Sequence, residues 1–235
     1  MRAALVVAAL VLLAACSPDD DETLTVFAAA SLTDAFTAIG DRFEDEHPDI
    51  DVVFSFAGSQ QLVAQVAEGA DADVVATADQ ESMRALDLRS TVFATNSLAI
   101  FVEPGNPLRI EALGDLARDD VTLVLAAPEV PAGRYAAAAL EAAGVEATPK
   151  SFEENVKAVV TRVALGEADA GIAYVSDLLV AADDVESISI PLTHNVVARY
   201  PFAAEPGDPL AAAFVDLVLG EEGQLILLRH GFGER

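Results

Sequence analysis

The chain of 235 residues has one cysteine and few basic residues. Because Cys16 stands alone, no disulfide can form within the chain, and the fold must be held together by packing. Only 13 lysines and arginines face 39 aspartates and glutamates, which gives a formal charge of −26. Nucleic acid and anionic membrane surfaces are therefore poor partners, since both repel a negative protein.

Motifs that would indicate an enzyme are also missing. The chain has no phosphate-binding P-loop and no G-x-G-x-x-G fingerprint, and Ser59 is followed by Gln60 and Gln61 instead of completing a G-x-S-x-G elbow. Neither Lys150 nor Lys157 follows a serine by three positions, which excludes a Ser-x-x-Lys pair. The three histidines are scattered without metal-ligand spacing. These absences favour a binding protein with no cofactor, no catalytic residue and no free metal cation.

The longest apolar run lies at the N-terminus, where Arg2 precedes residues 3–15. A run of about 13 apolar residues is too short to span a bilayer. Such a run after a basic residue predicts a secretory signal peptide. The small residues directly before Cys16 resemble a bacterial lipobox. This resemblance implies cleavage after residue 15, lipidation of Cys16, and a tether formed by residues 16–22. The alternative is an ordinary secreted protein in which the cysteine has no such role.

Strands and helices are expected to alternate along the rest of the chain. The expected strands are apolar runs, at residues 24–29, 51–56, 72–77, 95–102, 121–126, 170–174, 185–190 and 195–202. The expected helices have apolar residues at helical spacing or capping residues, at 31–46, 60–68, 79–86, 133–143, 154–165, 209–219 and 223–229. Repeated strand–helix units predict an α/β fold with mainly parallel sheets.

Two long strands indicate that the chain crosses twice between two lobes. The alternation restarts after strand 95–102, and another long strand covers 195–202. We expect lobe 1 to contain residues 23–101 and 196–235, and lobe 2 to contain residues 102–195. Ligands of open α/β sheets bind at the carboxyl ends of the strands. The ligand cleft is therefore expected between the lobes.

Ser31 and Ser59 each stand where an apolar strand turns into a helix. The first N–H groups of a helix lack backbone partners and carry the positive end of the helix dipole. A serine hydroxyl at that place adds one more donor. Taken alone, each serine would be a helix cap, and Asp34 would complete a capping box with Ser31. Two such turns together predict a cage of neutral donors around an anion.

Eight segments, in order and at compatible spacing, carry a resemblance to a known family. They include AAASLTDAF and FAGSQQL around the two serines, and together they cover residues 28–36, 56–62, 72–79, 96–102, 130–135, 154–157, 171–177 and 195–201. In these motifs the chain resembles the molybdate-binding proteins of ABC importers. The resemblance implies a two-lobed type II periplasmic-binding-protein fold that delivers molybdate, and tungstate, to a membrane permease and its ATPase.

The same resemblance implies the ligand set. Ser31 and Ser59 would donate from one wall of the cleft, and Ala132, Val156 and Tyr174 from the other, with Ala132 and Val156 donating backbone N–H groups. None of the five side chains is an obvious proton acceptor, which fits a fully ionised tetrahedral dianion better than a phosphate that carries a proton. Sulfate meets the same rule, so a binder of another oxyanion such as sulfate is the alternative.

These observations predict an extracytoplasmic, lipid-anchored monomer that captures its anion by hinge closure. Arg134 and Lys157 flank the expected donors, and we expect both in solvent. A tyrosine pair for a ferric ion is not expected, because Tyr135 and Tyr200 fall outside the ligand set.

Overall fold

The computed structural model describes residues 22–181 and 183–235. The predicted signal peptide, Cys16 and all but the last residue of the predicted tether lie outside this range. Strand β1 (Glu22–Ala29) begins at residue 22, the last residue of the predicted tether. Within the described part of the chain, no helix has the length and apolar character needed to cross a membrane.

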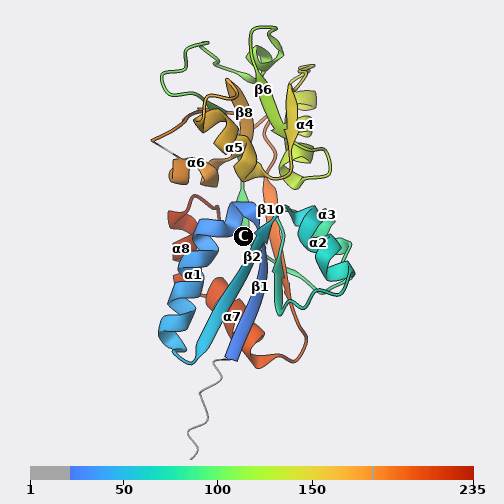
Figure 1. The fold of residues 1–235 in the computed structure, drawn as a ribbon, viewed down its shortest axis with the longest axis vertical. Helices are drawn as coiled ribbons and strands as arrows, with labels where there is room; N and C mark the ends of the chain where they lie inside the picture. The colour runs from blue at the N-terminus through green and yellow to red at the C-terminus, as the bar shows by residue number, and fades with distance from the viewer. Residues whose placement is uncertain (1–21, 182) are drawn as a thin grey trace, which may run out of the picture.

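The described chain forms two five-stranded sheets, one below the other in Figure 1. The strands of the first sheet, in spatial order, are β2 (Ile50–Ala57), β1, β3 (Val74–Ala76), β10 (Ala198–Ala204) and β4 (Thr91–Asn96). Those of the second sheet are β7 (Ser151–Glu153), β6 (Leu123–Ala126), β8 (Ala170–Tyr174), β5 (Leu98–Val102) and β9 (Glu186–Ser189). We keep the names lobe 1 and lobe 2 for these sheets with their flanking helices.

In each sheet one strand runs against the other four, β10 in lobe 1 and β5 in lobe 2. The opposite direction of β10 and β5 follows from the way in which the chain enters each sheet. The four like-directed strands end at the boundary between the lobes, whereas β5 and β10 enter their sheets from that boundary. The mainly parallel arrangement that we predicted is therefore confirmed, and the two exceptions are the two strands that follow a crossing.

The prediction of one strand at 95–102 was wrong. Asn96 ends β4 in lobe 1 and Leu98 begins β5 in lobe 2, with Ser97 between them. The first crossing therefore lies at residue 97, and residues 98–101 belong to lobe 2. An unbroken apolar run cannot tell which partner each half will pair with. The second crossing falls between β9 and β10, within residues 190–197. The expected boundary at 195 and 196 lies in this stretch.

Helices flank both sheets (Figure 1). Lobe 1 has α1 (Thr33–Glu46), α2 (Ser59–Ala67), α3 (Gln80–Arg84), α7 (Pro209–Leu219) and α8 (Glu221–Arg229). Lobe 2 has α4 (Pro131–Ala142), α5 (Val156–Ala164) and α6 (Val175–Ala181). Two 3-10 turns, η1 (Ala30–Leu32) and η2 (Leu113–Ala117), complete the described elements. We did not predict β7, which has three residues, or α6, which follows β8 without an intervening turn residue.

The two cores differ in composition. Phe36 in lobe 1 packs against Phe93 and Phe214, with ring centroids 5.5 and 6.1 Å apart. In lobe 2, α5 packs on β8 through buried Val159 and Val163. Burial of these apolar faces fixes α1 and α5 on their sheets, with their first residues at the boundary between the lobes. The predicted two-lobed α/β architecture is confirmed.

Candidate functional site

A small cavity lies between the lobes, where the like-directed strands end. Its free volume is about 10 Å³, enough for about one water molecule and far below the roughly 300–1,000 Å³ of pockets for larger organic ligands. Among the described residues that line it, none is charged. They are Ala29, Ala30, Ser31, Gly58, Ser59, Ala78, Val130, Pro131, Ala132, Asn155, Val156 and Tyr174. The structure thus brings all five predicted ligand residues to one cavity.

Lobe 1 presents two buried serine hydroxyls, and each is held by another group of the protein. The Ser31 Oγ lies 2.9 Å from the Tyr200 hydroxyl. The Ser59 Oγ accepts a hydrogen bond of 3.0 Å from the N–H of Ala78. Because an amide N–H can only donate, the Ser59 hydroxyl proton is available to the cavity. Tyr200 can donate to Ser31 in the same way, which leaves the Ser31 proton available too.

The start of α1 differs from our prediction. Ser31 lies in the turn η1, and α1 begins only at Thr33, with no side chain capping its first N–H groups. The expected capping box of Ser31 and Asp34 is therefore absent there. Asp34 Oδ2 instead lies 2.6 Å from Lys157 Nζ in lobe 2. The tighter 3-10 turn leaves Ser31 at the cavity while the Asp34 carboxylate is bound across the cleft.

Lobe 2 presents the starts of two helices. Ala132 is the second residue of α4, and Val156 is the first residue of α5. The first N–H groups of a helix have no partner within it. At α5 the Asn155 side chain accepts a hydrogen bond of 3.0 Å from the N–H of Ala158, which leaves the N–H of Val156 available. Each helix start can therefore offer a backbone N–H to a ligand.

Tyr174 ends β8 and its side chain is fully buried. Its hydroxyl is one of two buried side-chain atoms without a hydrogen-bond partner among the described residues. An unsatisfied buried hydroxyl costs about 1–3 kcal/mol. Burial raises the pKa of the Tyr174 and Tyr200 phenols well above their ordinary value, so both remain protonated at neutral pH. A ligand oxygen in the cavity would satisfy the Tyr174 hydroxyl.

Tyr200 is a site residue that the sequence did not reveal. It lies 169 positions from Ser31, and its hydroxyl holds the Ser31 Oγ. Its ring packs edge-on against the ring of Tyr174, with centroids 5.8 Å apart. Only the return of β10 into the first sheet brings Tyr200 beneath the cavity. Its place in segment 195–201 was a clue, but the role depends on this long-range pairing.

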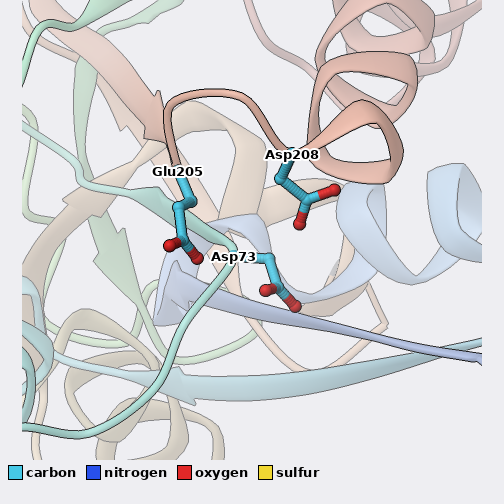
Figure 2. Close-up of side chains that lie close together, drawn as sticks. All are labelled: Asp73, Glu205 and Asp208. Atoms are coloured by element: carbon cyan, nitrogen blue, oxygen red, sulfur yellow. The ribbon is translucent and has the colours of Figure 1, made fainter.

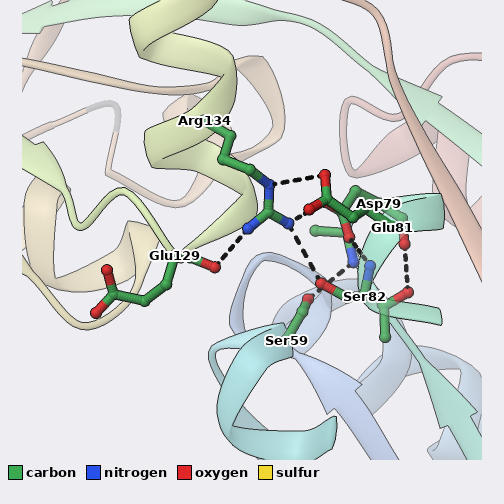
Figure 3. A network of polar contacts seen from close by, with 8 residues as sticks. Ser59, Asp79, Glu81, Ser82, Glu129 and Arg134 are labelled. Atoms are coloured by element: carbon green, nitrogen blue, oxygen red, sulfur yellow. Dashed lines mark hydrogen bonds and ion pairs between the residues drawn. The ribbon is translucent and has the colours of Figure 1, made fainter. Parts of the chain in front are cut away.

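Ion pairs of two basic side chains join the lobes beside the cavity. The side chain of Lys157 pairs with Asp34, and Arg134 pairs with Asp79 and, at 3.5 Å, with Glu81 (Figure 3). Only about a third of the Lys157 and Arg134 side chains is exposed. Our expectation that these two side chains lie in solvent was therefore wrong.

A group of three carboxylates lies elsewhere on lobe 1 (Figure 2). Oxygen atoms of Asp73, Glu205 and Asp208 lie within 4.8 Å of one another. Asp73 accepts a hydrogen bond of 2.7 Å from the N–H of Thr25, and Asp208 caps α7. These local bonds explain why two of the carboxylates are there, and we assign no metal to the group.

Comparisons with known proteins agree with this architecture. The family model of bacterial extracellular solute-binding proteins matches residues 24–233. The molybdate-binding protein ModA of Mycobacterium tuberculosis is 39% identical over 223 residues, which cover 90% of this chain and 85% of that protein. The Bacillus subtilis protein YvgL, whose name describes a substrate-binding lipoprotein of an ABC transporter, is 28% identical over 252 residues, covering 95% and 94%.

The structural neighbours include the periplasmic molybdate-binding protein of Azotobacter vinelandii. It superposes with a TM-score of 0.79 at 19% identity, over 90% of this chain and 99% of that chain. This likeness confirms the type II periplasmic-binding-protein fold. Since the family consists of solute-binding proteins, the prediction that the chain is not an enzyme is also confirmed. The chain belongs to the bacterial extracellular solute-binding proteins and, within them, to the group that contains the ModA proteins of ABC importers.

Proposed function

We propose that this protein captures molybdate, and also tungstate, outside the cytoplasm and delivers it to an ABC permease and its ATPase. Two sequence relatives named as molybdate-binding proteins, at 39% and 34% identity over nine-tenths of the chain, support the choice of anion. The ligand residues are Ser31, Ser59, Ala132, Val156 and Tyr174.

The observation that carries the proposal is the unpartnered Tyr174 hydroxyl in a cavity where other neutral donors converge. A hydrogen bond to a charged partner is worth about 1.5–3 kcal/mol, so five donors supply roughly 8–15 kcal/mol before desolvation is subtracted. Micromolar binding needs about 8 kcal/mol. The gross gain from five neutral donors therefore reaches the free energy that micromolar binding needs, with no lysine or arginine in contact with the anion.

The donor set also limits the kind of anion. No carboxylate or imidazole lines the cavity among the described residues. A phosphate that carries a proton would find no carboxylate or imidazole to accept it, whereas a fully ionised oxyanion accepts at every oxygen. Molybdate and tungstate satisfy this requirement, and so does the smaller sulfate. In our proposal the size of the cavity distinguishes molybdate and tungstate from the smaller sulfate.

Capture proceeds by hinge closure about the two crossings. They lie close together, because the N–H of Leu98 donates to Asn195 Oδ1 at 3.0 Å and Asn195 Nδ2 donates to the Leu98 carbonyl at 2.8 Å. Closure excludes water from the anion, which strengthens each hydrogen bond to it. The permease then recognises the closed form.

The protein acts as a monomer held at the membrane by lipid on Cys16. The lipobox resemblance and the Bacillus subtilis relative named as a lipoprotein support this part. The substitution Cys16→Ser should release the protein from the membrane fraction of cells that express it. Retention of the Cys16→Ser protein in that fraction would refute the anchor while leaving the anion site untouched.

The first test of the anion assignment is calorimetric titration of the chain from Pro18 onward. This chain contains every strand of both sheets and all the buried residues of their cores. Titrations with molybdate and tungstate should give tight one-to-one binding, and titration with sulfate should give far weaker binding. Equally tight binding of sulfate would overturn the choice of molybdate, and no binding of any oxyanion by folded protein would overturn the whole proposal.

A further inference from the structure

Two helices of lobe 2 have a basic residue in the first turn, where helices usually have an acidic residue. Lys157 is the second residue of α5 and Arg134 is the fourth residue of α4, and neither first turn contains an acidic residue. The positive end of a helix dipole disfavours a cation by about 0.3–1 kcal/mol. Elsewhere in the described chain the first turns of α1, α3, α6 and α8 carry aspartate or glutamate. The two bases therefore need a compensating partner.

That partner comes from lobe 1 in both cases. Lys157 Nζ lies 2.6 Å from Asp34 Oδ2 at the start of α1. Arg134 reaches Asp79, the residue that caps α3, and also donates at 2.6 Å to the carbonyl of Glu129 within its own lobe (Figure 3). Each ion pair thus joins the start of a helix in one lobe to the start of a helix in the other.

The four charged residues are close neighbours of the donors in the chain, although none of them lines the cavity. Arg134 and Lys157 follow Ala132 and Val156 by two positions and one position, and Asp34 follows Ser31 by three. Asp79 follows Ala78, whose N–H donates a hydrogen bond to the Ser59 hydroxyl oxygen. The charges therefore surround a neutral site, and any separation of the lobes parts both pairs.

We propose that Arg134 and Lys157 are positioning residues that first attract the anion to lobe 2 and then hold the lobes closed over it. This inference rests on the proposed function. With the lobes apart, both cations stand without their lobe 1 carboxylates beside the two helix starts, so an incoming dianion meets two cations there. Lobe 1 alone presents Asp34 and Asp79 near its hydroxyls, which disfavours first contact there.

When the lobes close, the side chains of Arg134 and Lys157 no longer face the anion but pair with carboxylates of lobe 1. The anion is then bound by neutral donors, while the two new ion pairs resist reopening. The pairs differ in strength because they differ in exposure. Side chains of Lys157 and Asp34 are 33% and 37% exposed, so salt screens their attraction. The Asp79 side chain is only 4% exposed, and a buried carboxylate that loses its cation is strongly destabilised. Arg134 should therefore contribute more to holding the closed form.

The test is the binding kinetics of the chain from Pro18 onward with molybdate. Tyr174 lines the cavity and Tyr200 packs against Tyr174, so tyrosine emission in a stopped-flow instrument can follow binding. The double variant Arg134→Gln with Lys157→Gln should associate about tenfold more slowly at low salt, with a weaker dependence on salt. It should also dissociate about tenfold faster.

Arg162→Gln is the matched control. Arg162 lies on α5, as Lys157 does, but pairs with Glu153 and Glu167 of its own lobe, so the control removes the same charge without parting the lobes. Its association and dissociation rates should stay within about twofold of the wild type. Rates for the double variant that match those of Arg162→Gln would overturn the proposal.

A second experiment needs no ligand. Spin labels on Glu68→Cys in lobe 1 and Glu141→Cys in lobe 2, both exposed positions, report the distance between the lobes. In anion-free protein, Arg134→Gln with Lys157→Gln should shift this distance distribution toward the open form, and Arg162→Gln should not. An unchanged distance distribution would refute the inference that the two ion pairs hold the lobes closed. Because this experiment involves no anion, its outcome is independent of a failure of wild-type protein to bind molybdate.

Discussion

The two lobes build one cavity from different chemical groups. Lobe 1 offers the side-chain hydroxyls of Ser31 and Ser59, whereas lobe 2 offers the helix starts at Ala132 and Val156 together with Tyr174. A side-chain hydroxyl disappears with one substitution, but a backbone N–H survives every substitution except proline. The lobes should therefore respond differently to mutation, although they would hold the same anion.

The largest expected effect is on lobe 1. The double substitution Ser31→Ala with Ser59→Ala removes two hydroxyl donors to a charged ligand, so calorimetry should show molybdate binding weakened by roughly 3–6 kcal/mol. The lobe 2 counterpart, Val156→Ala, keeps its N–H and should bind nearly as tightly as the wild type. Equal losses in the two variants would contradict the division of donors between the lobes.

Asp177 gives lobe 2 a pH dependence of stability. This carboxyl is buried in the first turn of α6, accepts a hydrogen bond from the N–H of Tyr174, and has Lys157 and Asp34 as charged neighbours. Burial raises its pKa from 3.8 to about 7. The folded protein therefore holds a proton that the unfolded chain releases between about pH 4 and pH 7. Stability should fall as pH rises through this window, by up to about 4 kcal/mol.

Urea unfolding of the anion-free protein at several pH values would measure this effect. The variant Asp177→Asn keeps a neutral acceptor for the N–H of Tyr174, and its stability should vary less between pH 4 and pH 7. An identical pH profile for the variant and the wild type would rule out Asp177 as the source.

Tyr174→Phe should change binding and stability in opposite directions. Loss of the hydroxyl should weaken molybdate binding by about 1.5–3 kcal/mol. The anion-free protein should be as stable as the wild type or more stable, because the hydroxyl has no partner among the described residues. Calorimetry and thermal unfolding of the same sample would measure both. Reduced stability of anion-free Tyr174→Phe would indicate a structural role for the hydroxyl.

The smallest expected effect is at Gly58, whose backbone lies close to the backbone of lobe 2. A Cβ atom built there would lie 2.8 Å from the Glu154 carbonyl oxygen of lobe 2. The backbone of Gly58 has φ −61° and ψ 140°, which alanine adopts readily. Gly58→Ala should thus leave lobe 1 folded but hinder closure, with an affinity loss of about 1 kcal/mol. Unchanged affinity would mean that the lobes tolerate a wider separation.

Local patterns in the sequence were sufficient for part of this picture. Strand β8 and helix α7 were predicted at their observed bounds. Strand β8 is a clear apolar run, and α7 begins with a proline and is followed by a glycine. The five residues that the family resemblance implied as ligands line one cavity, because each lies next to a strand end or a helix start. Local pattern alone singled out only the turns at Ser31 and Ser59.

Long-range contacts were beyond the sequence. The crossing at Ser97 is hidden in an apolar run whose halves pair with different sheets. Lys157 lies 123 positions from Asp34, and a lone lysine after a helix start gives no indication of a partner so distant. Tyr200 became a site residue only through the register of β10. Each of these depends on which strand pairs with which, and one sequence does not contain that information in local form.

The position of β10 determines the order in which the lobes can be completed. Lobe 2 is one continuous stretch of chain from β5 to β9, and all its strands are present once residue 189 has been made. In lobe 1, β3 and β4 are joined only through β10, which comes from the far end of the chain. A chain that stops before Ala198 therefore has a complete second sheet and a divided first one. During synthesis from the N-terminus, the lobe that is made first is the lobe that finishes folding last.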